Sequence, residues 1–500
     1  MGVRSDSYHP KREPEFDCDI SFENIKNIFS GCEDFYFREI RLGLEKNIFC
    51  AVCWIDGLVN EEDISRDMLR PLTDHERLRA ADSARRAVRL IEQGAVYRGT
   101  QRTRDAMDDL VSDLMAGHAA LIFEGLHLAV TFEVKSTQGR PVSEAAIEKA
   151  VKGPRDAFVE TLRINTGLVR RRLRTPKLKQ EQVILGRESR TPVSILYIEG
   201  IAQPERVAAV KKRLRDADLD AVLSAGDLEP YVMDGPDTPL PLAGHTERPD
   251  KFAAALLTGQ TGLLIDGLPT GFLLPGTLPL LMRAPEDRAD KPLVATGLTL
   301  LRWLALLLSL TLPGLYVAAA VHHQEMLPAR LLVSMVKAEQ SVPFGAAAVM
   351  LFLLIAFELL QEAGLRLPAP VGQTVSIIGA LLVGEAAVSA KVASPIAIII
   401  VALAGIAGYN VPNQELGALL RSLRPALVVC AALGGMFGLT LALAALVWYA
   451  CTAESFGVAW LYPLVDSEDS PLFRVFLKRN QRAYQMRDPA FVYWNRRRQK

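Results

Sequence analysis

The sequence predicts a cytoplasmic α/β region made of a duplicated α/β unit, followed by an α-helical transmembrane domain. Three observations predict this fold class: a pair of motifs that recurs at one spacing, an apolar second half that begins at Leu293, and a charged N-terminus without an apolar leader. Half of the 500 residues are hydrophobic, and the mean hydropathy of +0.16 lies between soluble and fully embedded proteins.

The N-terminal residues and the overall composition indicate where the chain resides. Residues 1–30 are polar and irregular, so we expect a flexible lead-in and no cleaved signal peptide. The first 290 residues should therefore stay in the cytoplasm, and six scattered cysteines fit a reducing compartment. The formal net charge of zero argues against nucleic acid as a partner.

The α/β duplication rests on two short motifs that recur together. Residues 110–132 read as helix, glycine turn, strand, hairpin turn and strand, and residues 253–274 repeat this order. Gly57 and Gly125 recur as Gly200 and Gly267, at offsets of 143 and 142 residues. We therefore expect a first α/β subdomain over 31–140 and a second over 190–290, each with helices on one face of its sheet.

Neither copy carries a signature of catalysis or nucleotide binding. GxGxxG, P-loop, HExxH and GxSxG patterns are absent from the sequence, which predicts no enzymatic activity, no cofactor and no metal. Cys50 and Cys53 form a CxxC inside a predicted strand, where residues three apart point to opposite faces. We interpret them as two packed thiols. Adjacent His322 and His323 point away from one another on a helix and make a poor metal pair.

Residues 141–189 are predicted as a basic linker region that contains an amphipathic helix. One face of this helix is apolar, with Phe158, Leu162, Leu168, Val169 and Leu173. The other face carries Arg163, Arg170, Arg171, Arg172 and Arg174. These arginines form either a solvated helix face or a contact with anionic lipid headgroups or an acidic neighbouring subunit.

The predicted membrane domain, residues 291–455, contains five apolar stretches: Leu293–Val321, Phe344–Leu360, Val371–Val388, Pro395–Tyr409 and Ala426–Ala450. The last has no charge in 25 positions and is long enough to cross the about 30 Å core. The C-terminal tail, residues 456–500, is basic and belongs on the same side as the N-terminal region. This requires an even number of spans, so we expect four spans and one re-entrant or interfacial segment.

Ionisable residues in the apolar stretches are the candidate pore or coupling residues. Glu358 and Glu362 share one helical face beside Gln361, and Glu385 precedes Lys391 by six positions. In one interpretation the acids lie at the membrane interface or pair with Lys391. In the other, an oligomer repeats each acid around an axis, and a carboxylate ring attracts cations.

Several phrases carry a resemblance to a known family. They are GPRDAFVETLRINTGLVRRRLRTPKLK, SILYIEGIAQPERV, TERPDKFAAALLTGQTGLLIDGLP, HHQEMLP and FELLQEAGLRLPAPVGQTVSIIGALLVGEAAV. Together, over residues 25–470, they resemble the A subunits of spore germinant receptors in the GerA family. The sequence departs from the family where VKAEQSVPFGAAA follows HQEM, and where Glu385 stands in GEAAV in place of the family's GQAAV.

The resemblance implies a membrane subunit in the inner spore membrane of a bacterial endospore. It implies B-type and C-type receptor subunits as partners, small nutrient germinants as the signal, and a homo-oligomer whose membrane part conducts monovalent cations. Two alternatives stay open. The chain could be a non-conducting membrane scaffold that assembles the receptor partners, or a divergent A-like sporulation paralogue.

Overall fold

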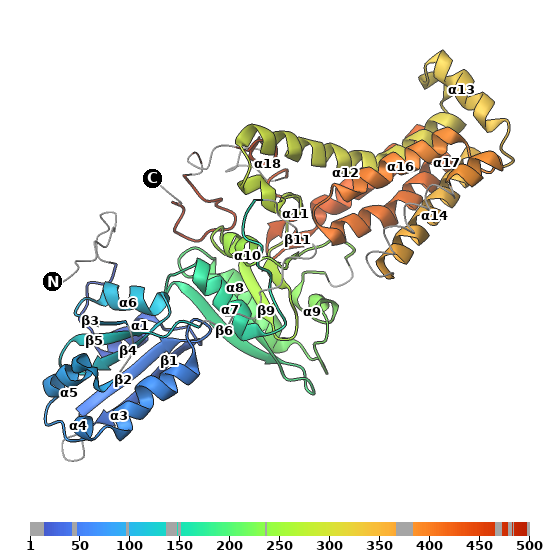
Figure 1. The fold of residues 1–500 in the computed structure, drawn as a ribbon. Coiled ribbons are helices and arrows are strands. Elements are labelled where there is room, and N and C mark those ends of the chain that lie inside the picture. Colours follow the sequence, from blue (N-terminus) through green and yellow to red (C-terminus); the bar gives the residue numbers. More distant parts are fainter. Residues whose placement is uncertain are drawn as a thin grey trace.

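The structure, a computed structural model, describes residues 15–42, 48–96, 100–136, 148, 152–235, 238–366, 384–465, 473–478, 483 and 485–497. Two α/β units lie next to one another, and a bundle of apolar helices extends from the second unit (Figure 1). The predicted fold class is therefore confirmed.

The first unit is built on an antiparallel sheet of five strands in the order β1-β2-β4-β5-β3. The strands are β1 Phe35–Leu42, β2 Ile48–Ile55, β3 Gln101–Arg104, β4 His118–Phe123 and β5 Leu128–Glu133. Its helices are α1 Phe22–Ile28, α2 Glu61–Ile64, η1 Ser65–Leu69, α3 Arg70–Asp74, α4 Glu76–Arg79, α5 Ala84–Leu90, η2 Ile91–Ala95 and α6 Met107–Met115.

The helices of the first unit cover both faces of its sheet, which corrects the one-sided arrangement predicted from the sequence. Helices α1 and α6 pack on one face, and the short helices from α2 to η2 pack on the other. The alternation of side chains along β2 explains this, because Cys50 points into one core and Cys53 into the other. Both thiols are fully buried, and burial raises the pKa of Cys50 to about 12.

The second unit repeats the first with a sheet in the order β6-β7-β9-β10-β8. Its strands are β6 Leu178–Leu185, β7 Thr191–Ile198, β8 Gly244–Thr246, β9 Thr261–Ile265 and β10 Gly271–Leu274. Each begins 143 residues after its counterpart in the first sheet. The helices are α7 Leu162–Arg172, α8 Pro204–Asp216, α9 Ala225–Val232, α10 Pro249–Leu256 and α11 Leu278–Leu281.

The ends of the two units differ from the predicted boundaries. Helix α1 lies inside the predicted lead-in and buries Phe22 and Ile25 in the first unit. Strand β6 lies inside the predicted linker but is the edge strand of the second sheet. Its mixed polar and apolar residues gave no strand signal, because one of its faces is only partly buried.

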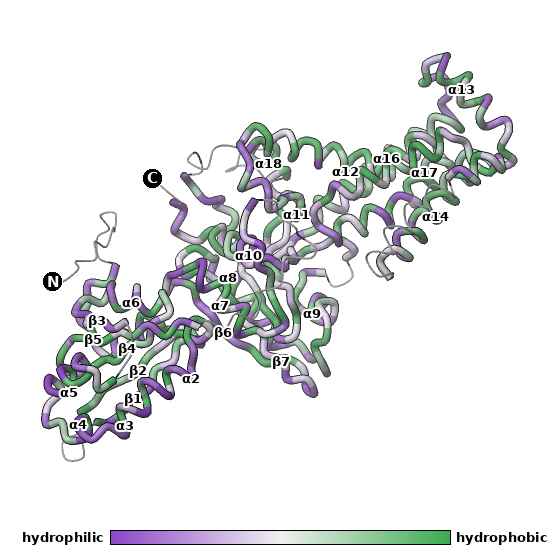
Figure 2. The backbone as a smooth tube through the Cα atoms, in the orientation of Figure 1, coloured by the Kyte–Doolittle hydropathy of each residue, from purple (hydrophilic) through white to green (hydrophobic). Residues whose placement is uncertain are grey.

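The apolar helices are α12 Pro292–Val321, α14 Ala346–Arg366, α16 Pro395–Tyr409 and α17 Gln414–Thr452, with η3 Pro285–Arg288 and η4 Gln324–Met326 beside α12. Three of them, α12, α14 and α17, are long and apolar enough to cross a membrane, and α16 is shorter. Helix α13, Ala329–Glu339, lies at the end of the bundle remote from the α/β units (Figure 1). Figure 2 shows that hydrophobic residues predominate along the bundle.

Helix α17 is a hairpin of two antiparallel helices that turn at Gly435. This residue has a φ of 59° and a ψ of −141°, outside the helical region. Leu427 and Leu439 both approach Gly314 of α12, although a straight helix would separate them by about 18 Å. At the other end, Glu415 contacts the second unit through His245, and the Tyr449 hydroxyl lies 2.8 Å from that of Thr238.

The hairpin corrects the prediction of one continuous span over Ala426–Ala450. A turn in apolar surroundings needs neither proline nor a polar residue when a glycine accepts the reversed backbone, and the sequence therefore looked uninterrupted. Of the other predicted stretches, Leu293–Val321 and Pro395–Tyr409 coincide closely with α12 and α16. Residues 371–383 of the third stretch lie outside the described residues, so the number of spans stays a prediction.

The described part of the C-terminal tail returns to the second unit. It contains β12 Val458–Ala459, which pairs with β11 Glu454–Ser455 just before the tail, and α18 Phe473–Phe476. The Trp460 indole donates a hydrogen bond to the Pro241 carbonyl, and Phe491 is buried in the second core. The tail and the α/β units therefore lie at the same end of the helix bundle, as the charge pattern predicted.

Candidate functional site

The predicted acidic pair on α14 is anchored to the hairpin. Glu358 accepts a hydrogen bond from Nε of Arg421 over 3.2 Å, and its side chain is 53% exposed. Glu362 is exposed one turn further along α14, and Gln361 between them is partly buried. The structure therefore gives Glu358 an arginine partner that the sequence analysis did not name.

Glu385 and Lys391 lie elsewhere in the bundle. Both side chains are exposed, in the described residues that precede α16. Ser394 follows them and lies 3.4 Å from the hydroxyl of Tyr316, near the C-terminal end of α12. Glu358, by contrast, contacts Arg421, about two helical turns from the start of α17. The two predicted acidic positions thus occupy different levels of the helix bundle.

A buried arginine in the bundle escaped the sequence analysis. Arg424 is 3% exposed and donates a hydrogen bond from Nη2 to the Ser309 hydroxyl of α12. Gly408 of α16 leaves room for this guanidinium, since a Cβ there would collide with Nη2. Among the described residues, Nε of Arg424 has no hydrogen-bond partner. The predicted stretch begins at Ala426, so Arg421 and Arg424 lie before it and are not among the candidate residues, whereas α17 begins at Gln414.

Arg163 and Arg170 of α7 form ion pairs with the first α/β unit. Arg170 is fully buried and makes a bidentate ion pair with Asp34 of the first unit, with two distances of 2.7 Å. Arg163 contacts Asp56 at 2.5 Å, and Gly167 lets the backbone of α7 approach Gly57 closely. The predicted lipid or partner contact is therefore wrong for Arg170, because α7 is covered on two sides.

The remaining residues of this basic group have local contacts. Arg172 pairs with Asp156 at 2.5 Å. Arg171 and Arg174 are exposed and donate hydrogen bonds to the carbonyls of Ser136 and Arg171, respectively. All five predicted apolar residues lie in the second core. Leu162, Leu168 and Val169 are on α7 and Leu173 is its C-cap, but Phe158 lies in a non-helical segment before α7, where the sequence predicts helix.

A cluster of three charged side chains connects the second unit to the hairpin. His245 on β8 lies with Nε2 3.1 Å from Oε1 of Glu229 on α9, and with Nδ1 2.6 Å from Oε1 of Glu415 on α17. Its side chain is 14% exposed, and the edge of the Phe272 ring packs against it at 4.4 Å between centroids. Burial lowers the pKa of His245, but the two carboxylates outweigh burial and raise this pKa to about 9.

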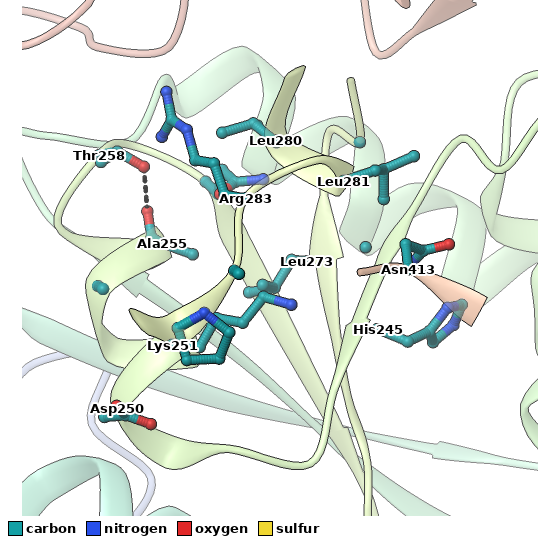
Figure 3. Close-up of a pocket in the computed structure, with 16 residues that line it drawn as sticks. His245, Asp250, Lys251, Ala255, Thr258, Leu273, Leu280, Leu281, Arg283 and Asn413 are labelled. Atoms are coloured by element: carbon teal, nitrogen blue, oxygen red, sulfur yellow. Dashed lines mark hydrogen bonds between the residues drawn. The ribbon is translucent and has the colours of Figure 1, made fainter. Parts of the chain in front are cut away.

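A cavity of about 90 Å³ adjoins this cluster. Figure 3 shows His245 and Asn413 together at one side of the cavity. Lys251 and Arg283 lie away from them, and Leu273 and Leu280 also line the cavity. Lys251 and Asp250 are held by ion pairs with Glu148 and Arg248. The cavity lies where α10 and α11 meet the residue that precedes the hairpin.

A second cavity of about 220 Å³ also adjoins the cluster. Glu229, Glu415 and residues 238–241 line it, so water can reach both carboxylates. Glu229, His245 and Glu415 offer ligand atoms within 4.8 Å of one another and are the group, within the described part of the chain, that could hold a metal ion. This group carries no local sequence signal, because its members come from three elements far apart in the chain.

Comparison with known proteins places both the α/β units and the bundle in one family. Residues 23–490 match the model described as Bacillus/Clostridium GerA spore germination protein. The chain belongs to the GerA family. This agrees with the resemblance found in the sequence motifs and assigns the α/β region and the membrane helices to a single family unit.

The relatives of this chain include a spore germination protein and an uncharacterized membrane protein. Spore germination protein KA of Bacillus subtilis is 34% identical over 446 residues, covering 88% of this chain and 81% of the relative. The uncharacterized membrane protein YfkQ of the same organism is 35% identical, covering 88% and 85%. The crystal structure of the N-terminal domain of the A subunit of the Bacillus megaterium germinant receptor GerK3 is 30% identical, covers 50% of this chain and 91% of that chain, and gives a TM-score of 0.40.

Proposed function

We propose that this chain is the A subunit of a spore germinant receptor, which responds to small nutrient germinants and triggers germination as a cation-conducting oligomer. The observation that carries the proposal is the GerA match, which spans both α/β units and the membrane helices. In this proposal the chain resides in the inner spore membrane, the α/β units face the cytoplasm, and B-type and C-type subunits are its partners.

The exposure of the membrane helices supports an oligomer. Only 22% of the apolar window of α14 is buried within this chain, against 56% for α12. Glu358 lies on this sparsely covered helix, and a carboxylate at membrane depth costs at least about 2.5 kcal/mol unless it meets water or protein. Copies of the chain arranged around an axis would give Glu358 a watery environment that attracts cations.

One observation favours the scaffold as a second candidate. Arg421 neutralises Glu358 within the same chain, as in a structural ion pair. A scaffold would hold B-type and C-type subunits through its α/β units and conduct no ions. The two candidates differ in whether Glu358 matters for ion flux or only for assembly.

Ion flux from spores or liposomes that carry this subunit with its partners tests the proposal. We expect monovalent cation release on addition of germinant, and a loss of release in Glu358→Gln or Glu385→Gln with unchanged membrane assembly. Unchanged flux in both variants would remove these acids as pore residues. No flux even with the partner subunits present would leave the scaffold as the supported function.

A further inference from the structure

The contact between His245 and Glu415 bridges two parts of the molecule with different roles. His245 belongs to β8, the edge strand of the second sheet, which pairs with β10 alone. Glu415 belongs to the first turn of α17, where Asn413 caps the helix by accepting a hydrogen bond from the Leu416 N–H. A shift of β8 relative to α9 therefore acts directly on the start of the hairpin.

The first arm of the hairpin makes further contacts inside the helix bundle. Arg421 lies about two turns after Glu415 and binds Glu358 of α14. Arg424 follows one turn later and binds Ser309 of α12. Three contacts along this arm of α17 thus connect it to the edge of the second sheet, to α14 and to α12.

The geometry of the cluster fits a protonated histidine better than a bound metal ion. The two carboxylates lie against different ring nitrogens at ion-pair distances, and neither ring nitrogen is aligned for a hydrogen bond with them. A metal ion binds one nitrogen of a histidine and gathers its other ligands around that nitrogen. The positive charge of an imidazolium, in contrast, attracts both carboxylates at these distances without a shared ligand position.

We propose that the His245 imidazolium, held between Glu229 and Glu415, is the positioning residue that couples movement of the second α/β unit to the α17 hairpin. The coupling role rests on the proposed function, because only a receptor needs the movement to be transmitted. The contact itself is observed in the structure. Loss of the positive charge uncouples the hairpin from β8, and another cation at position 245 retains the coupling.

Hydrogen exchange in the purified full-length chain tests the contact independently of any channel. We expect faster exchange over residues 414–424 in His245→Gln and in Glu415→Gln, and wild-type exchange in His245→Lys. Glu188→Gln, an exposed carboxylate in the β6–β7 turn, is the matched control. Unchanged exchange in both neutral variants would contradict the proposed role of the His245 contact. Equally fast exchange in His245→Lys would also contradict it, whatever the function of the protein.

Germinant-triggered cation release in spores tests the coupling. Coupling free energies between sites usually change equilibria by about 5- to 150-fold, so we expect release in His245→Gln to slow within this range, at equal membrane levels. His245→Lys should restore most of it, and adding Glu415→Gln to His245→Gln should slow it little further. Wild-type release in His245→Gln would refute the coupling, whereas a failure of the wild type to release ions would contradict the proposed function instead.

A metal titration separates the two chemistries of the cluster. The thermal midpoint of the purified chain should not respond to Zn²⁺ or to EDTA. A thermal midpoint that rises with Zn²⁺ in the wild type but not in Glu415→Gln would contradict the protonated His245. It would assign a metal site to Glu229, His245 and Glu415.

Discussion

At the scale of single residues, the pair of Arg170 and Asp34 decides how the two α/β units are joined. Both side chains are at most 4% exposed, and the guanidinium satisfies both carboxylate oxygens. Breaking a buried pair leaves an uncompensated charge, which costs about 3–5 kcal/mol. We expect Arg170→Met to lower the free energy of unfolding of the full chain by this amount, measured by denaturation in detergent.

Arg171 supplies the control for this prediction. It is the next residue on α7, its side chain is exposed, and its guanidinium contacts only a carbonyl among the partners described. Surface substitutions of this kind change stability by less than about 0.5 kcal/mol. Equal effects of Arg170→Met and Arg171→Met would contradict the assignment of Arg170 to the joint.

The charge of His245 gives stability a dependence on pH. Its folded pKa of about 9 lies above the ordinary 6.5, so its contribution is complete below about pH 6.5 and lost as the pH rises through 9. The groups that face the ring are Glu229 of α9, Glu415 of α17 and the Phe272 ring of β10. The thermal midpoint of the wild type should fall more steeply between about pH 7 and 10 than that of His245→Gln.

The residues of α7 show which features of single side chains could be predicted from the sequence. Helical periodicity predicted the apolar face of α7, and all five predicted residues are buried, although Phe158 lies in the segment before the helix. The fate of its arginines did not follow, because burial of Arg170 depends on an acid 136 positions away. His245 and Arg424 lacked any local signal for the same reason: their partners come from other elements.

At the scale of elements, the α17 hairpin depends on the backbone of Gly435. Its φ and ψ lie in a region that glycine alone adopts readily, and strain there costs about 1–3 kcal/mol for other residues. A Cβ would also lie 2.8 Å from the Cβ of His322 and from Nε2 of His323. We expect Gly435→Ala to lower the thermal midpoint and the membrane level of the chain.

Gly434 is the matched control for this element. It precedes Gly435 in the sequence, and no described atom lies within 4 Å of the position that its Cβ would take. Gly434→Ala should therefore leave the thermal midpoint near that of the wild type. If both variants behave alike, the hairpin does not turn at Gly435.

The hairpin also explains why length and hydropathy were misleading for this element. An uncharged run of 25 residues fits one span, yet the helical region is 39 residues, about 58 Å if straight. Most of the additional length comes from residues 414–425, whose arginines and proline kept them out of the predicted apolar stretch. Their position inside a membrane bundle depends on Glu358 and Ser309, which tertiary packing supplies.

At the scale of the whole molecule, the duplicated units use the same turn for different contacts. Gly57 of the first unit lies against Gly167 of α7, whereas its counterpart Gly200 lies against the ring of Trp494 in the tail. The repeat was visible in the sequence, because two motifs shared one offset and glycine marks their turns. The partners of these turns were not visible, since Gly167 and Trp494 lie far from Gly57 and Gly200 in the chain.

The arrangement of the chain predicts which surfaces lie on opposite sides of a membrane. Helix α12 starts beside the second unit and extends about 45 Å, longer than the about 30 Å core. Helix α13 follows at its far end (Figure 1). A cysteine replacing the exposed Ser334 of α13 should therefore be accessible from the side opposite to a cysteine replacing Glu188.

Labelling with an impermeant maleimide measures this accessibility. In a Cys18→Ser background, which removes the exposed native thiol, sealed cells that express the chain should label Ser334→Cys and spare Glu188→Cys. Permeabilised cells should label both. Cys430 and Cys451 are half-buried in the hairpin and set the background. Labelling of Glu188→Cys in sealed cells would place the α/β units outside. The contact of His245 with Glu415 would then transmit movement to the hairpin from the external face of the membrane.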